Sequence, residues 1–379
     1  MKILSVVGAR PNFVKVAPLI KEMQRYPQMH SALVHTGQHY DTSMSEQFFA
    51  ELEISPPDFN LGVGSGTHAV QTAEVMRRLE PILVAERPDL VLVVGDVNST
   101  LAAALTAVKL GIPVAHVEAG LRSFDRTMPE EINRILTDAI ADLLFVTEES
   151  GWQNLLREGI EPGKIHFVGN VMIDALQMFR PKWEHSSIFK RLALDPDRPY
   201  GILTLHRPSN VDDPVILMNL LRVLQELARH LPLIFPVHPR VRPRLRALGY
   251  SSSHREGIAY LDPLGYLDFI ALVSRARLIL TDSGGLQEES TVLSVPCLTL
   301  RDTTERPVTV THGTNRVIGT DPRRIVSEAR VVLTRLPQRV EPPPLWDGQA
   351  SHRIVSLLLK HTGAKIGADG PSDATPSPA

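Results

Sequence analysis

Residues 276–289 read ARLILTDSGGLQEE: an apolar run, a Ser-Gly-Gly turn and a polar stretch. The apolar run at 276–280 predicts a buried strand, and residues 286–293 predict a helix. A helix that begins directly after such a turn presents backbone N–H groups and the positive end of its dipole, which favour an anion, most often phosphate. Glu289, in the first turns of that helix, could accept hydrogen bonds from neutral hydroxyl groups. The stretch predicts either a phosphate site beside a carboxylate or an ordinary strand-to-helix turn with good caps.

The size and charge of the chain restrict the function classes. It has 379 residues, of which 43% are hydrophobic and 22% charged, with a formal net charge of −2. This length is long for one domain and comfortable for two. A nearly balanced charge gives no basic field for nucleic acid and no polybasic run for a membrane surface. We therefore expect neither nucleic acid nor membrane as a partner.

The cysteine content and the N-terminal sequence favour an ordinary cytoplasmic protein. Cys297 is the single cysteine, so it can form neither an internal disulfide nor a zinc cage, and its apolar surroundings predict a small buried side chain. Residues 2–7 predict a strand and lack the long apolar region of a signal peptide. No apolar stretch is long enough to cross a bilayer.

Strands and helices alternate through the first half of the chain. The expected strands are short and apolar on both faces, as in a parallel sheet that helices cover on both sides. These strands are expected at residues 3–7, 32–35, 90–94, 114–117, 143–146 and 165–168. The helices between them are expected at residues 14–25, 67–86, 100–110, 130–141 and 150–158.

The alternation pauses near residues 180–187 and then restarts. The second set of strands is expected at residues 201–205, 233–237, 258–261, 278–281, 297–300 and 317–319, with helices at 214–230, 267–276, 286–293 and 322–336. We therefore predict an α/β protein with two doubly wound, Rossmann-like domains that face each other across a cleft. The expected domains are residues 1–172 and 173–348. A last helix, at about 349–361, is expected to pack back on the first domain, and residues 363–379 have the composition of a disordered tail.

Charged side chains follow several strands of the first half, where ligands of parallel sheets bind. Arg10 and Lys15 follow the first strand and would suit a diphosphate, although two solvated basic residues are an equally good interpretation. Asp96 follows the 90–94 strand and could also be a helix cap. Glu118 directly ends an apolar strand, where a carboxylate is costly unless it is paired or used, so function is favoured. Glu130 starts the next helix, where acids are common for dipole reasons alone.

The second half offers a comparable set. His206 and His238 each end a strand; a lone histidine is more often structural than catalytic, but two at strand ends that face one cleft raise the odds of a functional role. Arg306 follows the strand that contains Cys297 and could reach a phosphate or a carboxylate. The first turn lacks the Gly-x-Gly-x-x-Gly pattern of dinucleotide sites, and neither a P-loop nor a metal-ligand spacing is present. No cofactor and no metal are expected, so the chemistry would depend on side chains alone.

Taken together, these stretches resemble the non-hydrolysing UDP-N-acetylglucosamine 2-epimerases. The resemblance extends from the GARP at residues 8–11 to the DGQA at 347–350 and is most specific at residues 95–96, 116–122, 281–289 and 301–307. It implies the glycosyltransferase-B architecture, in which two Rossmann-like halves hold the active site between them. It also implies a homodimer and a role in supplying precursors for cell-surface polysaccharide.

The resemblance assigns roles to individual residues. It implies that Asp96, Glu118 and Glu130 are the acidic groups near the sugar and that His206, the fourth catalytic candidate, lies close to the diphosphate. Phe269 would lie by the uridine, Glu289 by the ribose, and Arg306 would close the site. The substrate-binding set that the resemblance implies is Arg10, Lys15, Asp96, Glu118, Arg134, His206, Phe269, Ser283, Gly284, Gly285, Glu289 and Arg306.

The chemistry explains why such groups are needed. The proton at C2 of the sugar is poorly acidic because it is not next to a carbonyl, so loss of UDP from C1 is expected first. Cations stabilise the departing diphosphate, and carboxylates move the C2 proton on both faces of a glycal intermediate. The alternatives are a 2-epimerase for a modified UDP-sugar of the diacetamido-uronate type, a hydrolysing epimerase, a glycosyltransferase and a non-catalytic sensor. The presence of all three acids argues against the sensor.

Overall fold

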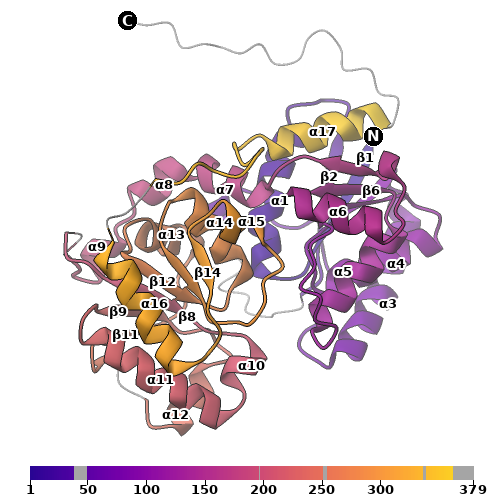
Figure 1. The fold of residues 1–379 in the computed structure, drawn as a ribbon. Coiled ribbons are helices and arrows are strands. Elements are labelled where there is room, and N and C mark those ends of the chain that lie inside the picture. The colour runs from indigo at the N-terminus through magenta and orange to yellow at the C-terminus, as the bar shows by residue number, and fades with distance from the viewer. Residues whose placement is uncertain (38–48, 196, 251–253, 336–338, 362–379) are drawn as a thin grey trace, which may run out of the picture. The chain divides into compact units, whose positions relative to one another are not determined.

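The computed structural model describes residues 1–37, 49–195, 197–250, 254–335 and 339–361. The chain divides into two units (Figure 1). Unit 1 contains Met1–Ala175 and Leu345–Ala379, and unit 2 contains Leu176–Pro344. The predicted tail at 363–379 lies outside the described residues. Within these ranges, no helix combines the length and the apolar character that crossing a bilayer requires.

Unit 1 is built on a parallel sheet of seven strands in the order β3-β2-β1-β4-β5-β6-β7. The strands are β1 (Lys2–Val7), β2 (His30–His35), β3 (Phe59–Asn60), β4 (Leu90–Val94), β5 (Val114–Ala119), β6 (Leu143–Val146) and β7 (Ile165–Phe167). The helices are α1 (Arg10–Met23), α3 (His68–Glu86), α4 (Asn98–Lys109), α5 (Pro129–Ile140), α6 (Glu149–Arg157) and α17 (Ala350–His361), and α7 (Val171–Met178) begins in unit 1 and ends in unit 2. The short β7 is preceded by the 3-10 turn Pro162–Lys164.

The sequence of unit 1 explains its core. All five residues of β4 are buried, as expected for an apolar strand with helices on both faces. The C-terminal helix α17 packs against α1, and the Trp346 indole N–H donates to the carbonyl of Thr147 at 2.9 Å. Asp174 accepts the N–H groups of Ala350 and Ser351 at the start of α17. The last helix thus completes unit 1 although it follows unit 2 in the chain.

Unit 2 contains a second seven-stranded sheet, in the order β10-β11-β9-β8-β12-β13-β14. Its strands are β8 (Gly201–Thr204), β9 (Leu233–Pro236), β10 (His254–Arg255), β11 (Ile258–Leu261), β12 (Leu278–Thr281), β13 (Cys297–Thr299) and β14 (Asn315–Val317). All described pairs are parallel except β10 with β11. The helices are α8 (Arg180–Glu184), α9 (Ile188–Arg191), α10 (Pro208–Val211), α11 (Pro214–Ala228), α12 (Arg242–Ala247), α13 (Tyr266–Ser274), α14 (Gly284–Val292), α15 (Val308–Thr311) and α16 (Pro322–Thr334).

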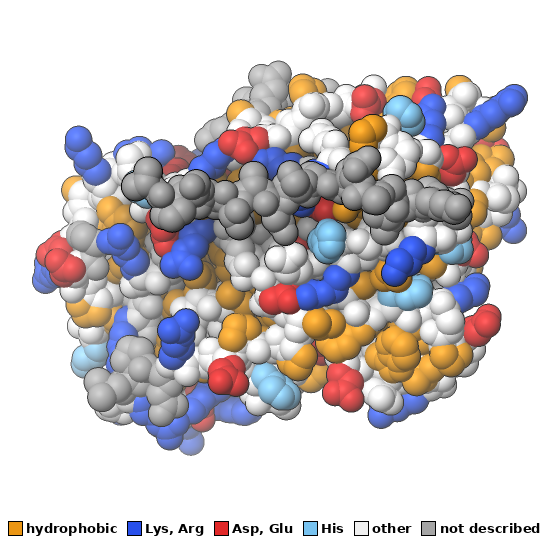
Figure 2. Space-filling view, turned by 90° about the horizontal axis from the view of Figure 1, so that it is seen from above, with side chains coloured by type: hydrophobic (Ala, Val, Ile, Leu, Met, Phe, Trp, Pro, Cys, Tyr) orange, Lys and Arg blue, Asp and Glu red, His pale blue; other side chains and the backbone are white. Residues whose placement is uncertain are grey.

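Both units confirm the predicted fold class. Each is a doubly wound α/β sheet of Rossmann type, and two such units are the composition of the glycosyltransferase-B architecture. The carboxyl ends of β1, β4 and β5 are neighbours in unit 1, and those of β8 and β12 are neighbours in unit 2. On the face in Figure 2, basic and acidic side chains are interspersed, and neither sign forms a continuous field.

Candidate active site

Lys15 and Glu118 form a buried ion pair at the carboxyl end of the sheet of unit 1. The Lys15 ammonium donates to Glu118 Oε2, and the two side chains are only 8% and 4% exposed. Lys15 lies in the second turn of α1, after β1, whereas Glu118 lies near the end of β5. The parallel sheet thus brings together two residues that are 103 positions apart. A buried pair of this kind needs a reason beyond stability, because desolvation offsets much of its attraction.

The backbone of Glu118 is strained. Its φ angle is +75°, in the left-handed region, and the register between β5 and β6 shifts between Val117 and Ala119. This is a β-bulge, and bulges are common beside active sites because they redirect a side chain. A non-glycine residue held in such a conformation costs on the order of 1–3 kcal/mol, and such strain clusters at functional sites. The observation favours a functional role for Glu118 over a structural one.

Gly95, which follows β4, provides the space for this ion pair. A Cβ atom at Gly95 would lie 3.2 Å from Glu118 Oε2 and 3.3 Å from Asn12 Nδ2. Asn12 donates to the carbonyl of Val94 and accepts the N–H of Ala9, both at 2.9 Å. The ends of β1, β4 and β5 are therefore held together around Glu118 by hydrogen bonds and close packing.

Arg134 on α5 binds two carboxylates. Its guanidinium donates to Asp96 Oδ2 and to Glu131 Oε2, each at 2.5 Å, and its side chain is 2% exposed. Glu131 also accepts the N–H groups of Ser123 and Phe124. Arg134 therefore positions Asp96 in this structure, which is a role that its prediction as a substrate-binding residue did not include.

The remaining predicted residues of unit 1 lie on the same helices. Arg10 is the first residue of α1 and is half-buried. Glu130 lies in the first turn of α5 and is half-buried, whereas the neighbouring Glu131 is buried. The structure thus separates the two adjacent acids, and Glu131 supports the loop at 123–124.

A buried network that the sequence did not reveal flanks Glu118. His116 Nδ1 lies 2.6 Å from Asp138 Oδ1, and His116 Nε2 lies 2.8 Å from the carbonyl oxygen of Gly95. Asp138 Oδ2 accepts the N–H of Gly120 at 3.0 Å and binds the Arg122 guanidinium at 2.7 Å. Burial alone raises the pKa of Asp138, but the charges and hydrogen bonds of His116 and Arg122 outweigh it and lower the pKa. Asp138 therefore holds residues on both sides of the bulge.

His206 has a comparable support in unit 2. Its Nδ1 lies 2.8 Å from Asp282 Oδ1, and the two side chains are 34% and 0% exposed. Its ring lies beside that of His238, with 5.6 Å between the ring centroids. The structure therefore brings the two strand-end histidines together, and it pairs His206 with Asp282.

The Ser-Gly-Gly turn starts α14. Ser283 is the N-cap residue, and its side chain makes no capping hydrogen bond. A Cβ atom at Gly284 would lie 2.5 Å from Arg306 Nη1 and 2.6 Å from Glu305 Oε1. Because the helix N-terminus is not capped by the Ser283 side chain, its geometry suits an anion such as phosphate.

Arg306 lies directly beneath this turn. Its guanidinium donates to Glu288 Oε1 at 2.6 Å and to Glu305 Oε1 at 2.5 Å, and its side chain is 6% exposed. Glu305 also binds Arg301 at 2.8 Å. The charge of Arg306 is therefore shared with two carboxylates, and the guanidinium lies close to Gly284.

Glu289 and Phe269 lie on neighbouring helices of unit 2. Glu289 on α14 is buried, and Phe269 on α13 is half-buried, so the phenyl ring is not the core residue that helical spacing alone indicates. Burial, together with the charge of Glu289, raises the pKa of Tyr266 well above its usual value. The Glu289 carboxylate therefore lies close to the start of α13.

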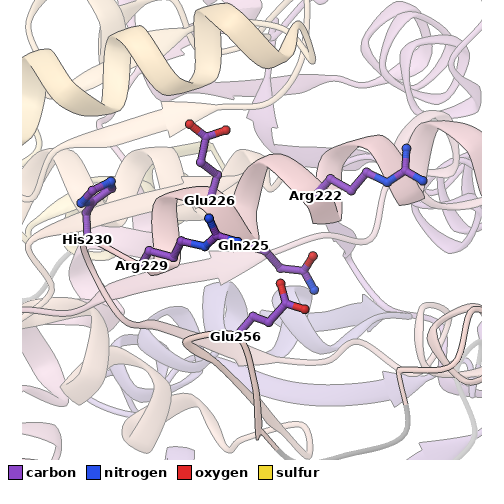
Figure 3. A pocket seen from close by; sticks show the side chains of 6 residues that line it. All are labelled: Arg222, Gln225, Glu226, Arg229, His230 and Glu256. Carbon is purple, nitrogen blue, oxygen red and sulfur yellow. The ribbon is translucent and has the colours of Figure 1, made fainter.

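Figure 3 shows a cavity elsewhere in unit 2, and it contains none of the predicted residues. Its volume is about 440 Å³. It is lined by Arg222, Gln225, Glu226, Arg229, His230 and Glu256. Five of these come from α11 and the residues after it, and their side chains are charged or polar. In the part of the chain that the structure describes, no group of three or more His, Cys, Asp or Glu side chains could hold a metal ion.

Several known proteins resemble this chain over nearly its whole length. The UDP-N-acetylglucosamine 2-epimerase of Methanocaldococcus jannaschii is 43% identical over 366 residues, which cover 94% of this chain and 99% of that protein. The UDP-2,3-diacetamido-2,3-dideoxy-D-glucuronate 2-epimerase of Pseudomonas aeruginosa is 42% identical over 95% of this chain and 100% of that protein. The crystal structure of the M. jannaschii enzyme in complex with UDP-GlcNAc and UDP has a TM-score of 0.90 and covers 95% of this chain and 100% of that chain, at 41% identity.

A protein-family model matches most of the chain. The model described as UDP-N-acetylglucosamine 2-epimerase matches residues 21–359. This range contains every predicted site residue except Arg10 and Lys15, which lie in the stretch just before it. The chain belongs to the UDP-N-acetylglucosamine 2-epimerase family.

Proposed function

We propose that the chain catalyses reversible epimerisation at C2, which interconverts UDP-N-acetylglucosamine and UDP-N-acetylmannosamine. Membership of the family supports the reaction class. The single observation that carries the proposal is Glu118, a strained and buried carboxylate paired with Lys15 at a strand end. Strain of this kind is retained where a carboxylate must be held in one position.

We assign the diphosphate, the ribose and the uracil of the nucleotide to protein groups that suit each of them. The N-terminus of α14 at Ser283–Gly285 offers backbone N–H groups and a positive dipole end to phosphate. His206 and Arg306 add positive or donor groups, and Glu289 can accept hydrogen bonds from the ribose hydroxyls. Phe269 supplies an aromatic face for the uracil. In unit 1, Arg10 and Lys15 are assigned to the phosphates.

The reaction begins with departure of UDP from C1. The C1–O bond breaks, its electron pair leaves with the diphosphate, and C1 becomes cationic. Donors and cations around the diphosphate act most strongly at this stage, because negative charge develops there. The C2 proton is then acidic enough for a carboxylate to remove it, which gives a glycal. Re-addition of UDP and protonation from the opposite face produce the epimer.

Three acids are candidates for the two proton transfers. Glu118 is the first choice because of its strained backbone. Asp96 is the second, because the Arg134 guanidinium holds it in place. Glu130 is the third and is half-buried in the first turn of α5. Inversion needs proton transfer on both faces of C2, so we expect two of these three to be essential.

The test is an incubation of the purified protein with UDP-N-acetylglucosamine in deuterated water. We expect UDP-N-acetylmannosamine and deuterium at C2 of both sugars, detected by NMR and mass spectrometry. Glu118→Gln should bind UDP but lose turnover by about 10²-fold or more. Absence of both the epimer and the deuterium would refute the proposal, and free N-acetylmannosamine would identify a hydrolysing enzyme instead.

A second substrate deserves the same test. The P. aeruginosa relative acts, by its name, on a UDP-diacetamido-glucuronate, and its identity to this chain is close to that of the M. jannaschii enzyme. The second candidate function is therefore 2-epimerisation of that modified UDP-sugar. Comparison of kcat/KM for the two substrates decides between them.

Further parts of the proposal come from the family resemblance. We propose that the enzyme is a cytoplasmic homodimer and that its product is a precursor of cell-surface polysaccharide. It needs neither a nicotinamide nor a metal. Sedimentation analysis tests the dimer, and full activity after dialysis against EDTA tests the metal.

A further inference from the structure

Asp282 is a fully buried carboxylate that is surrounded by hydrogen-bond donors. Besides His206 Nδ1 at 2.8 Å, it accepts the backbone N–H of His206 and of Arg207, both at 3.0 Å. The Asn210 side chain donates to it at 3.2 Å. Burial alone raises the pKa of Asp282, but the charge and hydrogen bond of His206, with the two backbone N–H groups, outweigh it and lower the pKa. Asp282 therefore acts as an acceptor in each of these contacts.

This contact determines which nitrogen of His206 carries a proton. Because Asp282 Oδ1 can only accept, Nδ1 must be the donor between them. Nε2 is then the nitrogen that remains for a ligand. The His206 side chain is a third exposed, so its ring is not enclosed by the protein.

Two paired strands hold His206 and Asp282 in this arrangement. His206 follows β8 by two residues and Asp282 directly follows β12, and these strands are paired from Leu278 with Gly201 to Thr281 with Thr204. Asp282 N–H also donates to the carbonyl of Thr204 at 3.3 Å. The carboxylate thus reaches the histidine from a rigid neighbouring strand, which is how positions within about 0.5 Å are maintained.

We propose that Asp282 is a positioning residue for His206 in the reaction proposed above. It keeps a proton on Nδ1 and fixes the orientation of the ring, so that the doubly protonated ring directs its Nε2–H at the diphosphate oxygen that accumulates negative charge when the C1–O bond breaks. The carboxylate also balances a positive charge on the ring at that stage. Asp282 itself contacts no substrate. This inference depends on the proposed function for its kinetic part only.

A double-mutant cycle tests the coupling. Asp282→Asn keeps the size of the side chain and one accepting oxygen but removes the charge, so kcat should fall by about 10²-fold. UDP affinity, measured by calorimetry, should change far less than kcat. In a His206→Gln background, Asp282→Asn should cause little further loss, because the residue through which it acts is gone. If the two losses multiply instead, Asp282 acts by another route and the proposal is wrong.

The adjacent histidine provides a matched control. His238 lies beside His206, whereas the hydrogen bonds to the Asp282 carboxylate come from His206, Arg207 and Asn210. In a His238→Gln background, Asp282→Asn should therefore keep its full effect on kcat. Loss of the effect in this background as well would show that the coupling is not specific to His206, which contradicts the proposal.

A spectroscopic measurement remains decisive if the variant fails to fold or if the enzyme acts on another substrate. In the wild-type protein labelled with 15N-histidine, with His206→Gln used for assignment, the His206 signals should show a proton on Nδ1. A neutral ring that carries its proton on Nε2 alone would overturn the inference, whatever the substrate. A protein that shows the Nδ1 proton but makes no epimer would instead refute only the proposed function.

Discussion

At position 118, glycine should give a more stable protein than alanine. The φ angle of Glu118 is +75°, and a left-handed conformation costs a non-glycine residue roughly 1–2 kcal/mol. Glycine avoids that cost but loses about 0.5–1 kcal/mol more conformational entropy on folding. The balance favours Glu118→Gly over Glu118→Ala by roughly 0.5–1 kcal/mol. Both variants remove the carboxylate from Lys15, so the loss of that ion pair cancels in the comparison.

The assay is thermal unfolding of the two variants, followed by calorimetry. A difference of this size corresponds to a shift in Tm of about 1–4 °C for a domain of 150–250 residues. Ala119→Gly is the matched control, because Ala119 is buried in the same strand and is not among the residues with positive φ. There glycine should destabilise the protein by about 1–2 kcal/mol, from the lost methyl group and the backbone entropy.

The sign of the difference decides the outcome. If Glu118→Ala is as stable as Glu118→Gly, or more stable, the bulge is not strained and the main argument for a functional Glu118 fails. Both variants should lack epimerase activity, because neither has the carboxylate. If the glycine variant is more stable than the alanine variant and equally inactive, the protein keeps a strained backbone at position 118 because the reaction needs the carboxylate there.

Three further predictions follow from single contacts. Gly284→Ala places a Cβ atom 2.5 Å from Arg306 Nη1 and should weaken UDP binding by about tenfold or more, since either the turn or the buried Arg306–Glu305 pair, both assigned to the phosphate site, must shift; unchanged affinity by calorimetry would contradict the phosphate assignment. Burial raises the pKa of the Cys297 thiol to about 12, so Ellman's reagent at pH 8 should label it only after unfolding in urea, and rapid labelling of the folded protein would refute its burial. Because the folded-state pKa of Asp138 is lowered, its stabilising effect should be complete above about pH 4 and lost as the pH falls further; Asp138→Asn should therefore cost about 3 kcal/mol of unfolding free energy near pH 7 and less at pH 3, as urea titrations can measure.

The regular elements were predictable because burial leaves a periodic pattern. The strand expected at residues 90–94 is β4, all of whose residues are buried, and the strand expected at 278–281 is β12. The helix expected at 286–293 begins instead at Gly284, because glycine has a low helix propensity and its pattern does not reveal the first turn. The two-residue strands β3 and β10 were missed, since two residues contain no period.

The polar residues at the strand ends were also predictable, but their partners were not. Glu118 and His206 stand out because each follows an apolar run. Their partners depend on which strands are neighbours: His206 and Asp282 are 76 residues apart and meet only because β8 pairs with β12. Strand order in a doubly wound sheet is a property of the whole fold, so no local pattern reveals it.

The arginines show a second limit of sequence reasoning. The resemblance assigns Arg134 and Arg306 to the substrate, and the structure adds that each binds two carboxylates, which for Arg306 was one of the two partners that its position indicated. The sequence shows that an arginine is present but not how its charge is shared. The positive φ of Glu118 likewise has no sequence signature, because glycine is the residue that normally indicates such a conformation.

The two buried aspartates have a common physical logic. Asp138 and Asp282 are both fully buried, and each binds donors that lie next to a strand end: the residues around Glu118 in unit 1 and His206 in unit 2. Burying a carboxylate costs several kcal/mol, and well-packed apolar residues often stabilise a core at least as well. What an apolar side chain does not provide is a fixed direction for a neighbouring polar group. The buried aspartates are therefore better explained by the need to hold Glu118 and His206 in one orientation than by stability, and the double-mutant cycle with Asp282 measures that difference directly.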